Sequence, residues 1–567
     1  MPPGTDSIRG LERRRFLAWC TSIGVGTTLF PGVLWTRMAA AQSENITKEM
    51  VAEAEKLAGL EFTDSERESI AKRLRSQIKD YDRLREVALS NDVPPAIQFD
   101  PVLPGMNITV PDRPAKRSDV TLTPIPKNLD ELAFWPVTHL AKAIETRQIT
   151  SSALTEMYLA RLKKYDPLLH CVVTLTEDLA RAQAAKADRE IAAGNYKGPL
   201  HGVPWGAKDL LAKSGYPTTW GATPYRDQTL DVDAAVVERL ENAGAVLVAK
   251  LSLGALAQGD VWFGGRTRSP WNPRRGASGS SAGPGAATAA GLVGFSIGSE
   301  TNGSIMSPSS VNGVSGLRPT FGRVSRYGAM ALCWSMDKLG PMCRTVEDCA
   351  LVFDAIYGPD GRDGSVQDWP FSWNADVKLP GLKIGYLESA FSKDAVQTGN
   401  RTRVLDDLRA LGARLVPVEY PDYPTTAMWL ILVVEAAAAF DELTRSNRDD
   451  LLVSQHGTAW PNTFRSARMV PAVEYIQANR IRTKLMEEMD VLMSQIDVIV
   501  TPTSTNLYLG NFTGHPMIAV PNGLSKRGEP TSIGFMGRLY DEGTLLAVAH
   551  RYQIATGHHL KHPEMPS

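Results

Sequence analysis

The sequence predicts an α/β protein in which helices cover both faces of a central sheet. From about residue 132 onward, segments with helical periodicity alternate with short, continuously apolar runs. Such alternation is typical of a buried sheet whose strands are joined by helices. We expect helices over 140–165, 179–193, 234–243, 286–292, 435–443 and 544–555, and strands over 245–249, 293–297, 496–501 and 517–520.

Residues 1–41 have the features of an export signal. Three arginines at 13–15 precede Phe16-Leu17, and a mildly apolar run over 18–34 leads to Ala39-Ala40-Ala41. These are the parts of a cleaved secretory signal, and the RRxFL order is similar to a bacterial twin-arginine signal. The alternative, a transmembrane anchor, is disfavoured because glycine and proline interrupt a short run. We expect an exported protein, periplasmic or secreted, with no stable membrane insertion after cleavage.

Residues 42–92 are expected to form a helical extension. Thr63 and Glu66 have the spacing of a capping box at the start of a helix. Apolar residues then recur at helical intervals between charged ones, at Ile70, Leu74, Ile78, Tyr81 and Leu84. A Pro-rich connector over 93–128 suits an extended strap or a linker, and 129–567 is the predicted main domain.

Composition narrows the classes of partner. The 567 residues include 61 basic and 62 acidic ones, a net charge of −1, so nothing predicts binding to nucleic acid. No His, Cys and Asp cluster has the spacing of a metal site. Cys20 lies in the predicted signal, and we expect the other cysteines to be buried free thiols; they are Cys171, Cys333, Cys343 and Cys349.

The segment 275–325 concentrates glycine, serine and alanine with two serine clusters. Glycine lets the backbone approach a ligand, and a serine activated by a base is a nucleophile. A flexible linker is disfavoured because apolar residues that favour burial are interleaved. A G-x-S-x-G elbow at Gly279–Gly283 lacks the preceding buried strand, and an S-x-x-K motif at Ser335–Lys338 is followed by Gly340-Pro341, which would end its helix.

Several motifs together resemble the amidase signature family. They are Gly202-Val-Pro-Trp-Gly-Ala-Lys-Asp209, Ser278-Gly-Ser-Ser-Ala-Gly283, Gly298-Ser-Glu-Thr-Asn-Gly-Ser-Ile-Met-Ser-Pro308, Gly316-Leu-Arg-Pro-Thr-Phe-Gly-Arg-Val-Ser325, Leu339-Gly-Pro-Met-Cys-Arg-Thr-Val-Glu-Asp348 and Asn511-Phe-Thr-Gly-His-Pro-Met-Ile-Ala-Val-Pro521. The resemblance covers roughly 130–560. It implies a large mixed, mostly parallel sheet, hydrolysis of a small-molecule amide without a cofactor or metal, and compatibility with a homodimer.

The resemblance also implies the roles of individual residues. Ser304 matches the nucleophile, Ser280 the bridging serine on a cis peptide, and Lys208 the base. Matching the oxyanion hole are the backbone N–H groups of Thr301, Asn302, Gly303 and Ser304, and the supporting residues are Asp209, Ser281 and Glu300. The chain departs from the family pattern at Ser299, Glu300, Asn302 and Met306, where threonine, aspartate, glycine and arginine are usual.

The chemistry of Lys208, Ser280 and Ser304 supports these roles independently of the resemblance. A lysine has an ordinary pKa of about 10.4, so it acts as a base only where burial disfavours its charged form. We interpret the departures as tuning of the pocket, with Asn302 keeping the loop's shape because asparagine tolerates positive φ.

Two other functions remain open. One is an amidase subunit of a tRNA-dependent amidotransferase, which export would disfavour. The other is a catalytically inactive binding member of the family.

Overall fold

A computed structural model of the chain describes residues 46–391, 399–505 and 507–566. The chain divides into two compact units, one of Met1–Ser90 with Met469–Pro471, the other of Asn91–Arg468 with Ala472–Ser567. The export signal predicted over 1–41 lies outside the described residues. No helix in the described part has the length and apolar character needed to cross a bilayer.

The first unit contains two helices, α3 (Lys48–Ala58) and α4 (Asp64–Arg85). The predicted capping box is confirmed: the N–H of Thr63 donates to Glu66 Oε2 at 2.7 Å, and the N–H of Glu66 donates to Thr63 Oγ1 at 3.4 Å. Arg67 of α4 donates to the buried carboxylate of Glu55 on α3. This ion pair and the apolar contacts of Ile46, Val51 and Ala71 join the two helices.

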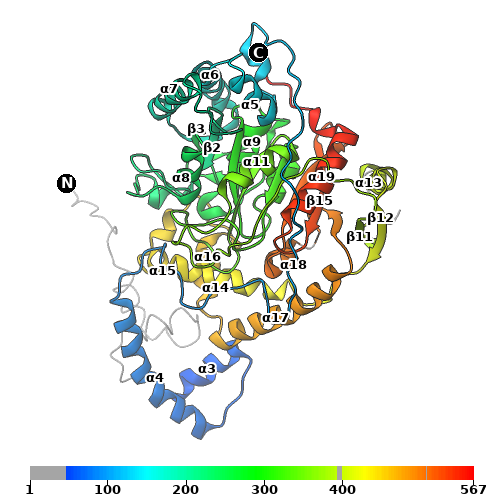
Figure 1. Cartoon of the computed structure of the whole chain (residues 1–567). Coiled ribbons are helices and arrows are strands. Elements are labelled where there is room, and N and C mark those ends of the chain that lie inside the picture. Colours follow the sequence, from blue (N-terminus) through cyan, green and yellow to red (C-terminus); the bar gives the residue numbers. More distant parts are fainter. Residues whose placement is uncertain (1–45, 392–398, 506, 567) are drawn as a thin grey trace, which may run out of the picture. The chain divides into compact units, whose positions relative to one another are not determined.

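The second unit is built around an eleven-stranded sheet (Figure 1). Across the sheet the order is β1 (Val172–Leu175), β3 (Val246–Leu251), β2 (Pro204–Lys208), β8 (Phe295–Glu300), β10 (Lys338–Cys343), β9 (Ser315–Arg318), β14 (Met517–Leu524), β15 (Pro530–Gly537), β13 (Val498–Pro502), β11 (Lys383–Leu387) and β12 (Arg414–Val418). Two small hairpins, β4 (Val261–Trp262) with β5 (Gly265–Arg266) and β6 (Arg268–Ser269) with β7 (Asn272–Gly276), lie outside it.

The large mixed sheet is confirmed, but parallel pairing does not predominate in it as expected. Strands β3, β2 and β8 run parallel, as do β12, β11 and β13, and the other neighbouring strands are antiparallel. The physical reason is the connections: β14 and β15 form a hairpin, and only a loop joins β9 to β10, whereas a parallel pair needs a long crossover.

Helices cover both faces of the sheet. Their bounds are α5 (Val137–Glu145), α6 (Ser151–Leu169), α7 (Glu177–Ala192), α8 (Ala235–Asn242), α9 (Ala282–Ala289), α10 (Met306–Asn312), α11 (Val346–Ile356), α12 (Glu388–Phe391), α13 (Gly399–Ala410), α14 (Leu430–Ala439), α15 (Asp441–Arg445), α16 (Trp460–Ala467), α17 (Ala472–Ser494), α18 (Leu507–Thr513) and α19 (Glu542–Thr556). Helix α9 packs on α10 and on β2 and β8, while α11 packs on α8, α19 and β10. Helix α14 packs on α16 and α17 (Figure 1).

Several predicted elements have different bounds. The helix expected over 140–165 is divided into α5 and α6, because Arg147 adopts φ +58° and Thr150 caps a new helix by accepting the N–H of Ala153. The helix expected over 286–292 is α9, which begins at Ala282. The sequence does not predict β9, β10, β11, β12 and β15, since glycine or proline interrupts each of their apolar patterns.

The Pro-rich connector follows the surface of the second unit as an extended segment. Just before the connector, the Asn91 side chain bonds to both the N–H and the carbonyl of Ala331, at 2.7 and 2.9 Å. The Phe99 ring packs edge-on against Phe321, with centroids 5.0 Å apart. Further along, Lys116 exchanges backbone hydrogen bonds with the 373–375 segment. The connector is therefore a strap anchored at several points.

Candidate active site

Lys208 is the last residue of β2, and its side chain is completely buried. Its Nζ lies 2.8 Å from Ser280 Oγ, 3.0 Å from Ser281 Oγ and 2.8 Å from Ser299 Oγ. Burial lowers the pKa of Lys208 to about 7, although the charges of Asp337 and Glu300 act in the opposite direction. Near neutral pH a large fraction of this amine is therefore uncharged and able to accept a proton.

The two serine clusters of the sequence meet at this lysine. The Gly279–Ser280 peptide bond is cis, and Ser281 precedes the first turn of α9. The N–H of Ser281 donates to the carbonyl of Ser304 at 3.1 Å, which places Ser304 beside the first cluster. Gly279 is required sterically, because a Cβ there would lie 1.8 Å from the carbonyl oxygen of Gly259.

The loop that carries Ser304 joins β8 to α10. Its left-handed residue is Gly303, with φ +85°; Asn302 does not have a positive φ, so the role predicted for it is wrong. Glycine takes this conformation without steric cost. The N–H groups of Asn302, Gly303 and Ser304 donate to no other group in the described part of the chain. They remain available to a substrate oxygen.

Glu300 holds this loop from beneath. Its Oε2 accepts the N–H groups of Ile305 and Met306 at 2.8 and 3.0 Å, and its Oε1 accepts from Arg318 and Asn511, both at 3.0 Å. Burial alone would raise the pKa of Glu300, but the Arg318 guanidinium and the hydrogen bonds outweigh it and lower the pKa to about 2. The carboxylate is therefore ionised near neutral pH and places a negative charge against the loop.

The other departures from the family pattern also have visible contacts. Asn511 of α18 donates to Asn302 Oδ1 at 3.2 Å as well as to Glu300. Met306 is fully buried in a small apolar cluster with Ile305 and Met342. An arginine is not needed at 306, because Arg318 already pairs with Glu300.

Two residues have contacts that the sequence does not predict. The Asp209 carboxylate is directed to partners other than the Lys208 amine: it pairs with buried Lys250 at 2.8 Å and accepts the hydroxyl of Thr219 at 2.5 Å. Ser299, whose departure from the family pattern is interpreted as tuning of the pocket, has a hydroxyl that contacts Lys208 directly. Its position one residue before Glu300 at the end of a strand was the only available signal.

Within the described residues, no group of three or more His, Cys, Asp or Glu side chains is arranged to hold a metal ion. The four cysteines after the predicted signal are buried free thiols: Cys171, Cys333, Cys343 and Cys349.

A cavity of about 680 Å³ lies beside the loop. Ser299 and Thr301 line it on the side of the site, and Leu210 and Ala257 lie next to them in its wall. This volume is typical of small-molecule sites. The geometry therefore combines a buried neutral amine, serine hydroxyls, free backbone donors and a space for a substrate.

The family model described as Amidase matches residues 153–509. The chain belongs to the amidase signature family. This amidase is 32% identical to a glutamyl-tRNA(Gln) amidotransferase subunit of Methylococcus capsulatus, over 75% of this chain and 97% of the relative. It is 34% identical to a Mycobacterium bovis protein assigned as the amidase AmiD, over 77% of this chain and 98% of that relative.

A solved structure with a similar fold is the peptide amidase from Stenotrophomonas maltophilia. It matches this amidase with a TM-score of 0.70 and 29% identity, over 77% of this chain and all of that chain. The predicted fold class is confirmed, and the protein is an amide hydrolase. About a quarter of the chain lies outside these alignments, while the relatives are covered almost completely.

Proposed function

We propose that the protein is an exported amidase that cleaves a carboxylic amide through an acyl-enzyme on Ser304. Neutral Lys208 takes the proton of Ser280, which in turn takes the proton of Ser304 as its oxygen attacks the carbonyl carbon. The N–H groups of the 301–304 loop stabilise the oxyanion. Each well-placed donor there contributes about 3 kcal/mol to lowering the barrier.

The second half of the reaction reverses the same proton path. The proton held by Lys208 returns through Ser280 to the leaving nitrogen, so the C–N bond breaks and the amine departs. Water then enters, gives its proton along the same route and releases the acid from Ser304. The proton taken from water returns through Ser280 to the Ser304 oxygen as the acid leaves, so water and the chain's own groups complete the balance of protons.

The observation that carries this proposal is the contact of fully buried Lys208 with Ser280, at 2.8 Å. Labelling with a serine-directed fluorophosphonate tests it. We expect Ser304→Ala not to be labelled, and Ser280→Ala to be labelled much more slowly than the wild type. Ser310→Ala is a matched control on α10, because Ser310 bonds to Ser532 and lies outside the proposed triad. Unchanged labelling of Ser304→Ala would contradict the assignment of the nucleophile.

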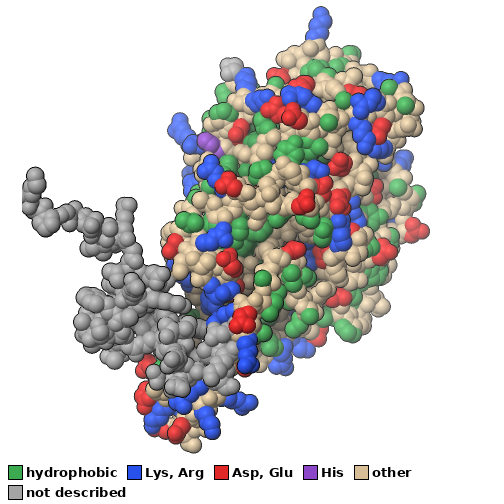
Figure 2. Space-filling view, turned by 90° about the vertical axis from the view of Figure 1, so that its left-hand side faces the viewer, with side chains coloured by type: hydrophobic (Ala, Val, Ile, Leu, Met, Phe, Trp, Pro, Cys, Tyr) green, Lys and Arg blue, Asp and Glu red, His purple; other side chains and the backbone are tan. Residues whose placement is uncertain are grey.

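A second candidate is a subunit of a tRNA-dependent amidotransferase, because relatives with that name match almost their whole length. On the face shown in Figure 2, Lys and Arg side chains are interspersed with Asp and Glu rather than gathered in one patch. The two candidates differ in what happens to released ammonia. Free ammonia without any partner protein supports the amidase, whereas ammonia formed only in the presence of a partner and aminoacyl-tRNA supports the second candidate.

A further inference from the structure

The cavity beside the active-site loop has a wall that precedes the family match. The connector contributes Pro94, Ile97, Phe99 and Leu103 to its lining, whereas the family match begins only at residue 153. The alignments with the relatives leave about a quarter of this chain unmatched. This wall therefore comes from a segment that lies ahead of the residues matched by the family model.

The lining is mainly apolar and aromatic. Facing the connector are Phe321, Met330, Leu332, Trp334 and Met486. Ile97 is 90% exposed and Ile476 is 57% exposed, and both line the cavity. Exposed apolar residues that gather around one cavity are typical of a ligand-binding groove.

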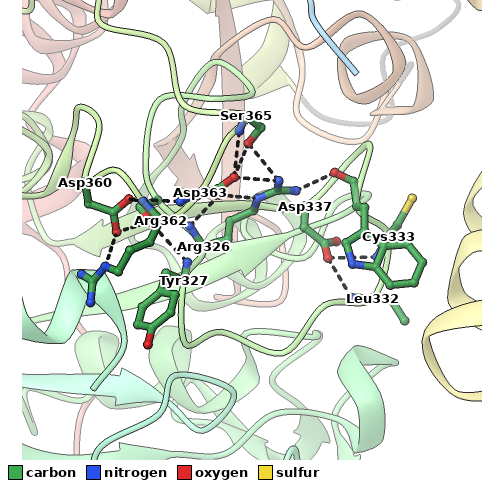
Figure 3. A network of polar contacts seen from close by, with 11 residues as sticks. Arg326, Tyr327, Leu332, Cys333, Asp337, Asp360, Arg362, Asp363 and Ser365 are labelled. Atoms are coloured by element: carbon green, nitrogen blue, oxygen red, sulfur yellow. Dashed lines mark hydrogen bonds and ion pairs between the residues drawn. The ribbon is translucent and has the colours of Figure 1, made fainter. Parts of the chain in front are cut away.

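Two of the charged side chains in the wall are already engaged, whereas Asp92, Asp100 and Arg480, which also line the cavity, are exposed. Figure 3 shows Arg326 paired with Asp363 at 2.9 Å and bonded to Ser365, while Asp337 accepts the backbone N–H groups of Leu332 and Cys333. These contacts hold the 326–337 loop against the 360–365 segment. Neither charge is left for a substrate.

Two buried charges on the side of α14 and α17 are engaged as well. Buried Glu435 accepts from Ser335 and from the Tyr475 hydroxyl, at 2.6 and 3.0 Å. Buried Arg482 donates to the hydroxyl and the carbonyl of Ser335, at 3.0 and 2.9 Å, and stacks on the Phe99 ring at 3.5 Å. Phe99 thus covers the buried Arg482 guanidinium with an aromatic surface.

The cavity reaches two residues that adjoin the proposed reacting groups. Ser299 lines it and contacts Lys208, and Thr301, which opens the oxyanion loop, lines it as well. A substrate whose carbonyl lies at the loop would extend its remaining part along Phe99 and Phe321.

We propose that this cavity binds the large apolar or aromatic group of an uncharged amide, and that Phe99 of the connector is a specificity-determining residue. The proposal rests on the proposed function for the position of the reacting carbonyl. It assigns to the connector a part in substrate selection that the rest of the family fold does not supply.

A matched pair of amides tests it with the purified full-length protein. Butanamide and 4-phenylbutanamide differ only in the ring, and glutamine presents a chain of similar length with charged groups. We expect kcat/KM for 4-phenylbutanamide to exceed that for butanamide at least about tenfold, and glutamine to be the poorest of the three. Equal efficiency for the matched pair, or a preference for glutamine, would overturn the proposal.

Single-residue variants test whether Phe99 causes the preference for 4-phenylbutanamide. Phe99→Ala should raise KM for 4-phenylbutanamide about tenfold. The kcat for this amide and the kcat/KM for butanamide should stay nearly unchanged. Phe99→Leu should retain most of the preference. Ile108→Ala is the control, because Ile108 lies on the connector but outside this cavity. An equal change for both amides in Phe99→Ala would reject the role of Phe99.

A filling variant and a binding measurement complete the test. Ala331→Trp should remove hydrolysis of 4-phenylbutanamide and preserve that of butanamide, and it remains informative if Phe99→Ala does not fold. Calorimetric binding to Ser304→Ala separates the two proposals, since it does not require turnover. Tight binding of 4-phenylbutanamide without hydrolysis by the wild type would reject the proposed function alone; hydrolysis without a ring preference would reject the role of the cavity alone.

Discussion

Lys208 shows how burial changes the chemistry of one side chain. A lysine is ordinarily charged at neutral pH, but here β2 places the amine among three serine hydroxyls with no carboxylate in direct contact. Lys250, also buried and only one strand away, pairs with Asp209 instead. Lys250 has a carboxylate partner and forms a structural ion pair. Lys208 has no carboxylate in contact with its amine and is the proposed base.

The pH dependence of turnover follows from the Lys208 pKa of about 7. The neutral amine is the active form, so kcat/KM should rise about tenfold per pH unit below pH 7 and level off above it. Lys208→Met should abolish the inflection and reduce kcat by about a thousandfold or more, with an unchanged circular dichroism spectrum.

Lys338→Met is a matched control for that profile. Burial also lowers the pKa of Lys338 to about 7, but its amine donates to the carbonyl of Met336 and not to the serines. The inflection near pH 7 should therefore persist in this variant. Its loss from Lys338→Met, with retention in Lys208→Met, would reassign the base.

Glu300 should make folding stability sensitive to acid. Its folded pKa of about 2 is below the ordinary value of 4.5, so its stabilisation is complete above pH 4.5 and is lost as pH falls toward 2. The free energy of unfolding of Glu300→Gln should be about 3 kcal/mol lower than that of the wild type at pH 7, because Arg318 is left unpaired. On acidification, the free energy of unfolding should fall less in this variant than in the wild type. Urea unfolding at pH 7 and pH 3 measures both, and equal acid sensitivity would contradict this assignment.

At the scale of elements, α18 reaches the 301–304 loop, which carries the proposed oxyanion donors, from a distant part of the chain. Asn511 bonds to Glu300 and to Asn302, so one amide connects the helix to both ends of the loop's turn. We expect Asn511→Ala to lower kcat about tenfold with little change in KM, because the donors are less well positioned. Tyr508→Phe on the same helix is the control, and a change confined to KM would argue against a positioning role.

Arg344 joins the elements that frame the first serine cluster. Its buried guanidinium donates to the carbonyls of Thr288, Val293 and Gly294, between the end of α9 and the start of β8, and to that of Trp135. Arg344→Met should lower the free energy of unfolding by about 3 kcal/mol, because four carbonyls lose a charged donor. Exposed Arg181, paired with Glu156, is the comparison, and its replacement should change stability by less than about 1 kcal/mol.

At the scale of the whole molecule, the remaining question is where the protein acts. Replacing Arg13 and Arg14 together with lysine should retain the chain in the cytoplasm, because a twin-arginine signal depends on that pair. Cell fractionation and immunoblotting of the wild type and the double variant measure this. The control replaces Arg9 with lysine, and equal export of both variants would contradict the twin-arginine route.

Local patterns predicted part of the fold and most of the site. Helices over 179–193 and 234–243 and the strand over 245–249 agree with α7, α8 and β3 to within a few residues, because their periodicity is uninterrupted. Strands such as β10 and β15 contain glycine or proline, and tertiary pairing rather than local propensity makes them extended. The reversal between α5 and α6 was missed because one left-handed arginine produces it.

The sequence by itself determined the resemblance to the family, the order of its motifs and the candidate residues Lys208, Ser280 and Ser304, because these depend on residue type and spacing. Only the tertiary structure decided that Ser299 joins them, that Asp209 pairs away from them and that Arg318 and Asn511 hold Glu300. It also decided that the connector forms a cavity wall. Burial, pKa and contact depend on which strands become neighbours, and the pairing of β2 with β8 is a long-range property of the packed sheet.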